Sequence, residues 1–155
     1  MVLIHDNFLT DQEFSSAWEA IKNVTWKTRG AINRVAIDLP WLETKLCWTE
    51  DEDCFIYVTR MDDKINASMK WHKDISSPLK LKPGQEFTTS IVQWLIYMGG
   101  DFTGGILQTR EQDIEPKTNR FVLLDPFTEE HNVTPVTGFR YALNGFLYKY
   151  KEVPV

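Results

Sequence analysis

Apolar and polar residues follow two different periods along this chain. Near the N-terminus, four apolar residues recur at helical spacing: Phe14, Ala17, Trp18 and Ile21. The residues just before them, Thr10 to Glu13, have the capping-box pattern that opens a helix. The pattern therefore predicts a helix that begins after Thr10 and lays its apolar stripe against a sheet.

Other segments are rich in β-branched and aromatic residues, which is typical of strands. We predict strands at residues 2–4, 54–60, 87–98, 121–124 and 140–150. Many short strands, one clear helix and no regular alternation of the two predict a mainly β fold with a flanking helix. The expected architecture is a double-sheet jelly roll.

Residues 24–53 follow neither period. Gly30 and Pro40 interrupt this segment, and Pro40 is placed to begin a short helix. We interpret the acidic residues 50–53 as a solvated turn, with a contact to a basic substrate as the alternative. The whole segment leaves room for a lid.

The composition is that of a single globular domain spanning residues 1–155. Its net charge of -5 argues against a nucleic acid or an anionic membrane as a partner. The N-terminus lacks a secretory signal pattern, and no apolar run approaches membrane-spanning length. We therefore expect a cytoplasmic protein in which Cys47 and Cys54 are a reduced, structural pair.

Histidine is scarce, and two of the three histidines occur in patterns that suggest a metal site. On an extended segment His72 and Asp74 point to the same side, so an imidazole and a carboxylate face one ion together. With His131 they make the ligand set of a non-haem Fe(II) facial triad, which leaves three positions for a cosubstrate and O₂. A His-x-Asp tripeptide also arises by chance, so a plain structural histidine is the alternative for His72.

Arg140 follows Gly138 at the start of the last predicted strand. If its side chain points into the barrel, the buried guanidinium needs a carboxylate partner, and no acidic residue near it in sequence is an obvious one. A dicarboxylate cosubstrate would supply that partner through a bidentate pair. A surface arginine or an internal salt bridge is the alternative.

Several blocks between residues 54 and 150 resemble one enzyme family. They are residues 72–74 (HKD), 94–98 (WLIYM), 104–107 (GGIL), 119–124 (NRFVLL) and 131–146 (HNVTPVTGFRYALNGF). Together they are similar to the prolyl-4-hydroxylase-like branch of the Fe(II)/2-oxoglutarate dioxygenases. The final block is the most specific, because its histidine, Val-Thr-Pro-Val, glycine and arginine fall in the family's order.

This resemblance implies a double-stranded β-helix, a cupin-like barrel that holds Fe(II) through His72, Asp74 and His131. Arg140 would pair with the distal carboxylate of 2-oxoglutarate. The implied reaction hydroxylates a C–H bond with O₂ and releases succinate and CO₂, and ascorbate commonly supports such enzymes. By the same resemblance the expected substrate is a proline-containing peptide or protein.

The chain also departs from the family. Met69 stands where many relatives have a tyrosine, so we consider Tyr57 as a source of the cosubstrate hydroxyl contact. Phe146 replaces a frequent tryptophan and should share the face of Arg140, where it would wall the pocket. Tyr97 is expected to line either the pocket or the core.

Three alternatives to prolyl hydroxylation stay open. They are the same chemistry on a small molecule, a catalytically silent barrel that acts as a binding module, and a cupin-type metalloenzyme that does not use 2-oxoglutarate. Because the chain is close to a minimal barrel, we expect an open groove with residues 27–52 and 75–86 along its rim.

Overall fold

The computed structural model describes residues 2–26, 32–47, 52–62, 71, 85–126 and 129–152, with the backbone alone for 32, 85–91 and 148–152. The strands form two antiparallel sheets. The larger sheet has the order β1 (Val2–His5), β9 (Phe121–Leu124), β5 (Gln85–Gly99), β11 (Val136–Glu152), β4 (Tyr57–Asp62) and β2 (Ile32–Ala36). Two further strands pair with β11: β3 (Glu52–Cys54) and β6 (Phe102–Gly104). The smaller sheet consists of β10 (His131–Val133), β7 (Leu107–Thr109) and β8 (Asp113–Ile114).

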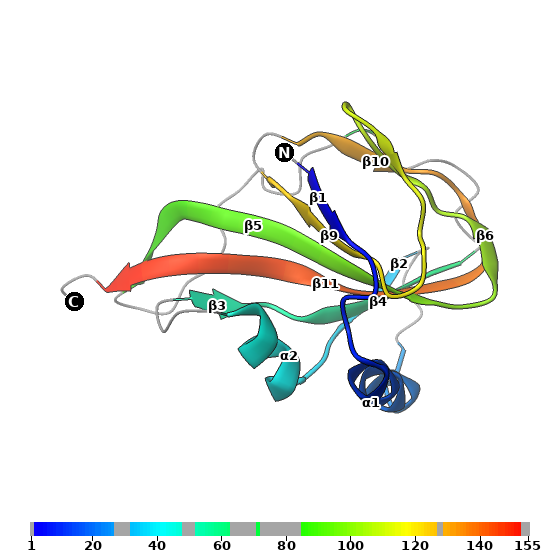
Figure 1. The fold of residues 1–155 in the computed structure, drawn as a ribbon, viewed down its shortest axis with the longest axis horizontal. Helices are drawn as coiled ribbons and strands as arrows, with labels where there is room; N and C mark the ends of the chain where they lie inside the picture. The colour runs from blue at the N-terminus through cyan, green and yellow to red at the C-terminus, as the bar shows by residue number, and fades with distance from the viewer. Residues whose placement is uncertain are drawn as a thin grey trace.

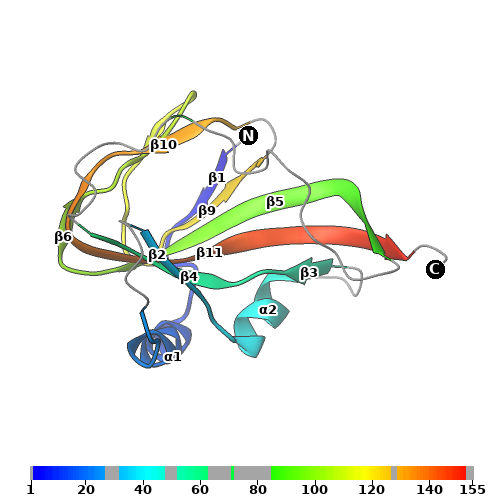
Figure 2. The ribbon, with the colours of Figure 1, turned by 180° about the vertical axis from the view of Figure 1, so that it is seen from behind.

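The two faces of the larger sheet have different covers (Figure 1). Helices α1 (Asp11–Lys22) and α2 (Pro40–Leu46) lie on one face, which we call the outer face. The smaller sheet lies over the other, the inner face, as the view from behind also shows (Figure 2). This arrangement confirms the predicted mainly β, double-sheet fold with a flanking helix.

Alternation along the strands divides the core between these two faces. Trp94, Ile96 and Leu143 point outward and pack with the helices, where Ala17 and Ile21 of α1 are buried as the helical stripe predicts. The inner-face cluster holds residues from both sheets: Tyr97, Leu107, Ile114, Val122, Leu124 and Ala142. Each fully buried large apolar side chain stabilises the fold by roughly 1.5–3 kcal/mol, so both faces contribute.

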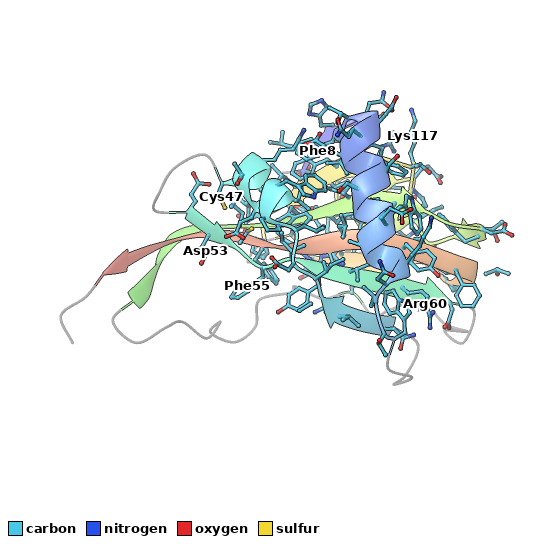
Figure 3. The ribbon with its side chains drawn as sticks, turned by 90° about the horizontal axis from the view of Figure 1, so that it is seen from below. Phe8, Cys47, Asp53, Phe55, Arg60 and Lys117 are labelled. Atoms are coloured by element: carbon cyan, nitrogen blue, oxygen red, sulfur yellow. The ribbon has the colours of Figure 1, made fainter. Side chains whose placement is uncertain are left out.

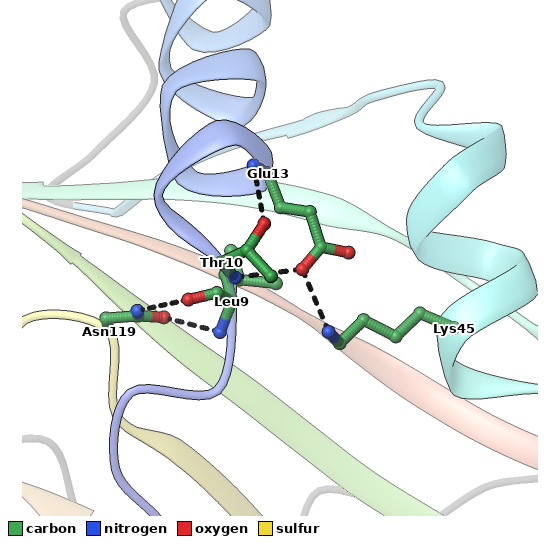
Figure 4. A network of polar contacts seen from close by, with 5 residues as sticks. All are labelled: Leu9, Thr10, Glu13, Lys45 and Asn119. Carbon is green, nitrogen blue, oxygen red and sulfur yellow. Dashed lines mark hydrogen bonds and ion pairs between the residues drawn. The ribbon is translucent and has the colours of Figure 1, made fainter.

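Helix α1 begins with the predicted capping box. The Thr10 hydroxyl accepts a hydrogen bond from the Glu13 N–H at 3.1 Å, and the Thr10 N–H donates to Glu13 Oε1 at 2.9 Å. The same Oε1 accepts from Lys45 Nζ of α2 at 2.9 Å (Figure 4). These contacts, led by the Thr10 backbone bond, lower the pKa of Glu13, so its carboxylate joins the two outer helices.

The start of α1 is fixed to the sheet by one distant asparagine. Asn119 Oδ1 accepts from the Leu9 N–H at 2.9 Å, and Asn119 Nδ2 donates to the Leu9 carbonyl at 2.8 Å (Figure 4). Asn119 also has a φ of 61°, a left-handed conformation that asparagine adopts more readily than most residues.

We expect Asn119→Ala to lower the free energy of unfolding by about 3 kcal/mol, from two lost hydrogen bonds at about 1 kcal/mol each and about 1 kcal/mol of backbone strain. Asn119→Gly, which loses only the bonds, should cost about 2 kcal/mol. Urea unfolding measures both. Asn7→Ala is the matched control for the backbone cost, because Asn7 has a φ of 54° and no side-chain hydrogen bond among the described residues. A loss no larger than that of the control would contradict the role of these bonds.

The structure also differs from the sequence prediction in residues 24–62. The predicted strand 54–60 is wrong in its bounds, because it is divided into β3 and β4 around Phe55 and Ile56. There the Phe55 carbonyl lies so close to Gly145 of β11 that any side chain at Gly145 would clash with it. The acidic turn is wrong for Glu52 and Asp53, which lie in β3.

The segment expected to form a lid or a rim, residues 24–53, holds an edge strand and a helix of the fold. Strand β2 was not predicted, while α2 begins at Pro40 as expected. Helix α2 packs on the outer face, so the rim expectation for residues 27–52 is wrong for this helix. The expected rim at 75–84 lies outside the described residues.

No described helix is long and apolar enough to cross a membrane.

Candidate functional site

The inner face of the larger sheet holds one deeply buried cation, Arg140 of β11. Its side chain is 7% exposed, and Nη1 donates a hydrogen bond to the Gly105 carbonyl at 3.1 Å. A Cβ added to Gly105 would lie 3.2 Å from Arg140 Cδ, and Gly105 has a φ of 72°. Glycine at position 105 therefore gives the guanidinium the space to lie against the backbone.

The guanidinium of Arg140 has no carboxylate partner among the described residues. Its Nε is buried, and the N–H there donates to no acceptor among those residues. Burial lowers the pKa of Arg140, but a guanidinium stays protonated in proteins. Arg140 is thus a buried cation with unused donors, which is the environment expected for a residue that binds an anionic ligand.

Tyr97 of β5 lies beside this cation. The centre of its ring is 5.3 Å from the guanidinium carbon of Arg140, and the side chain is 1% exposed. The Tyr97 hydroxyl is buried without a hydrogen-bond partner among the described residues. Burial raises the pKa of Tyr97, against the opposing effect of Arg140, so the hydroxyl keeps its proton and can donate.

The sequence left Tyr97 between pocket and core, and the structure places it in the inner-face cluster next to Arg140. Trp94, Ile96 and Met98 pack on the outer face, so a strand in this segment must turn Tyr97 inward.

His131 faces Arg140's sheet from the opposite side of the barrel. It opens β10 of the smaller sheet, pairs in register with Thr109, and is 5% exposed. Its Nδ1 lies 3.2 Å from the Glu129 carbonyl oxygen, which can only accept. A neutral imidazole that donates from Nδ1 to this carbonyl has its lone pair on Nε2, the form that a metal ion requires.

The other two predicted ligands, His72 and Asp74, lie outside the described residues. Within the part of the chain that is described, no group of three or more His, Cys, Asp or Glu side chains could hold a metal ion. The roles of His72 and Asp74 as metal ligands stay predictions.

Trp71, the residue just before His72 in the sequence, is described by the structure. The guanidinium carbon of Arg110 lies 3.9 Å from the centre of the Trp71 ring, and Arg110 pairs with Glu130 at 2.9 Å. Glu130 is the neighbour of His131 in sequence. Through Arg110, Trp71 therefore lies near the end of the smaller sheet where β10 begins.

Tyr57 and Phe146 lie farther along the inner face. Tyr57 pairs in register with Asn144, and the Arg34 guanidinium carbon lies 5.6 Å from its ring centre. Phe146 is half-buried and alternates onto the face of Arg140, as the sequence predicted. Met61, rather than Tyr57, is the register partner of Arg140. The roles proposed for Tyr57 and Phe146 stay predictions.

Comparisons with known proteins give one consistent result. Residues 56–148 match the family model described as the 2OG-Fe(II) oxygenase superfamily. A prolyl-4-hydroxylase from Pseudomonas putida has a similar structure, with a TM-score of 0.68 and 16% identity over 96% of this chain and 92% of that one. No curated protein matches the sequence.

Two further solved structures bind different molecules. A prolyl hydroxylase from Trichoplax adhaerens, in complex with a hypoxia inducible factor peptide fragment, has a TM-score of 0.59 and 15% identity over 96% of this chain and 83% of that one. HygX from Streptomyces hygroscopicus, with nickel, 2-oxoglutarate and hygromycin B bound, has a TM-score of 0.62 and 13% identity over 96% and 82%. At these identities the likeness establishes the fold.

Proposed function

Because the chain belongs to the 2OG-Fe(II) oxygenase superfamily, we propose that its inner-face site binds Fe(II) and 2-oxoglutarate and hydroxylates a C–H bond. The observation that carries this proposal is the buried Arg140, whose Nε has no partner among the described residues and whose guanidinium lies beside the ring of Tyr97. Succinate and CO₂ would be the products from the cosubstrate, and ascorbate is a candidate supporting reductant.

Arg140 and Tyr97 fit one end of a dicarboxylate. Both present hydrogen-bond donors in a buried place, where hydrogen bonds to a charged group contribute about 1.5–3 kcal/mol each. The apolar side chains around them, including Leu107, Val122 and Ala142, exclude water and strengthen this attraction. The pair would hold the distal carboxylate and leave the other end of the molecule for the metal.

The metal would be held by His131 together with His72 and Asp74. The Glu129 carbonyl fixes the His131 tautomer and directs Nε2 away from that carbonyl. Bound Fe(II) supplies the activation of O₂ that no side chain of this chain can supply. The described residues bind, orient and shield the reactants.

For the substrate, we favour a prolyl residue in a peptide or protein. Its support is the sequence resemblance and the structural likeness to prolyl hydroxylases. Hydroxylation of a small molecule is the second candidate, because HygX, which is similar in fold with a TM-score of 0.62, was solved with hygromycin B bound. Both candidates use the same iron and cosubstrate contacts.

The test is succinate formation from 2-oxoglutarate by the iron-loaded protein, with and without a set of proline-rich peptides. We expect slow succinate formation with no substrate, faster formation with an accepted peptide, and a mass gain of one oxygen in that peptide. Turnover without substrate would exclude a silent binding module. If the iron-loaded protein neither binds 2-oxoglutarate nor forms succinate, the proposal is wrong, whereas turnover without any oxidised peptide would favour a small molecule.

A further inference from the structure

A cysteine pair lies on the outer side of the molecule, away from Arg140 and His131. Cys47 follows the last turn of α2, and Cys54 is the last residue of β3. Burial raises the pKa of both thiols and each thiol also shifts the pKa of the other, while Leu46 and Glu52 beside them in the chain line one cavity, so the two cysteines are neighbours. Figure 3 shows Cys47 at the end of α2, close to β3.

Backbone contacts hold both cysteines at this position. The Cys47 N–H donates to the Glu43 carbonyl at 2.9 Å, which closes the end of α2. Cys54 pairs in register with Leu147 of β11, and its N–H donates to Asp53 Oδ1 at 2.8 Å. Each cysteine is therefore held in place by its own element, and the two elements, α2 and β3, are in contact.

We propose that Cys47 and Cys54 form an intramolecular disulfide when the protein meets a small disulfide oxidant such as oxidised glutathione. Both side chains are half-buried, so a small oxidant can reach them. The pair is a redox modification site that the hydroxylase chemistry does not use.

The exchange proceeds in two balanced steps. The Cys47 thiolate attacks one sulfur of oxidised glutathione, the S–S bond breaks, and one glutathione thiolate leaves. The Cys54 thiolate then attacks the Cys47 sulfur of the mixed disulfide, and a second glutathione thiolate leaves. In total, two protein thiols are oxidised to one disulfide and one glutathione disulfide is reduced to two glutathione thiols.

The surroundings set the order and the pH dependence of these steps. Burial raises the pKa of Cys47 and Cys54 lowers it, whereas Cys47 raises the pKa of Cys54, so Cys47 loses its proton first. Burial raises the pKa of both thiols, so the reactive thiolates are scarce at neutral pH. The rate should therefore increase about tenfold for each unit of pH while the attacking thiol remains mostly protonated.

The disulfide would join two walls of a cavity on the outer face. This cavity has a volume of about 430 Å³. Its lining includes Leu46 and Glu52, which lie within two residues of Cys47 and Cys54 in the sequence. Oxidation would fix α2 against β3 at this cavity and close a short loop between them. The inner-face site is on the other side of the sheet.

The experiment incubates the full chain with defined ratios of reduced and oxidised glutathione, blocks free thiols, and measures the intact mass. We expect loss of two hydrogens, a crosslinked peptide that contains both cysteines, faster reaction at pH 8.5 than at pH 7, and a melting temperature raised by several degrees. Dithiothreitol should reverse these changes.

Cys54→Ser is the matched control, because it should stop at a mixed disulfide of Cys47 with one glutathione. Accumulation of mixed disulfides in the unmodified chain, without loss of two hydrogens, would overturn the proposal, as would disulfides that form only between chains. Failure of 2-oxoglutarate turnover would not affect these readouts, so the two proposals fail independently.

Discussion

Replacing Arg140 by methionine should remove 2-oxoglutarate binding and leave the folded state at least as stable as before. Loss of one partner of a buried charge pair costs about 2–5 kcal/mol, so we expect the Kd for 2-oxoglutarate to rise at least thirtyfold. Without the cosubstrate, however, the buried guanidinium leaves Nε without a partner among the described residues. An apolar side chain of similar length removes that desolvation cost and still fills the space.

Two measurements test this pair of outcomes: titration of the metal-loaded protein with 2-oxoglutarate, and urea unfolding of the ligand-free protein. Arg34→Met is the matched control, because Arg34 is also an inner-face arginine but is exposed, and it should change neither result. Tyr97→Phe should raise the Kd about tenfold, since it removes one hydrogen bond. Unchanged 2-oxoglutarate affinity in Arg140→Met would show that the carboxylate binds elsewhere.

Replacing His131 by alanine should abolish metal binding and, with it, succinate formation. The imidazole is the one predicted ligand that the structure describes, and its Nδ1 contact to the Glu129 carbonyl prepares Nε2 for a metal. Changes to residues that merely orient metal ligands typically cost 10–100-fold in metal affinity, so losing a ligand should cost at least about 100-fold. Equilibrium dialysis with Fe(II) under anaerobic conditions measures the affinity.

His5→Ala provides the comparison for this measurement. His5 is exposed on β1 and contacts Phe8 edge-on, with ring centres 5.7 Å apart, so its loss should leave metal affinity unchanged. Equal metal affinity in the two variants would contradict a role for His131 as a ligand. Retained metal with lost turnover in His131→Ala would instead assign it to a later step.

Local signals in the sequence were sufficient for much of the fold. The capping box and apolar stripe predicted α1, because both depend on residues three or four positions apart. Strands β5 and β11 were predicted because long runs of β-branched and aromatic residues leave few alternatives. Both strands are longer in the structure than predicted, since β5 and the end of β11 pair into more polar residues and the start of β11 pairs with β6.

Short strands were missed because distant partners create them. Strand β10 has three residues and exists through its pairing with β7. Strand β2 is the last strand of the larger sheet among the described residues, and its sequence, Ile-Asn-Arg-Val-Ala, has little apolar alternation. No local pattern in either segment reports that a partner strand is near.

In the site, too, some features follow from the local sequence and others depend on distant strands. The need of Arg140 for a carboxylate was predicted from its position at the start of a strand, and its burial agrees. The choice of Tyr97 as its neighbour depends on the register between β5 and β11, in which Tyr97 pairs with Ala142. Register across a sheet is a long-range property, so the sequence could not place the Tyr97 ring next to the guanidinium.

The strand order has a consequence for the time at which this protein can fold. Strand β11, the last described strand in the chain, lies between β5 and β4 in the larger sheet. The first strand, β1, pairs with β9, more than a hundred residues later. During synthesis the early strands must therefore wait for residues 136–152 before the sheet closes, and contacts this distant slow folding. We expect the sheet to close late in synthesis, with Arg140 brought to Tyr97 in the same step.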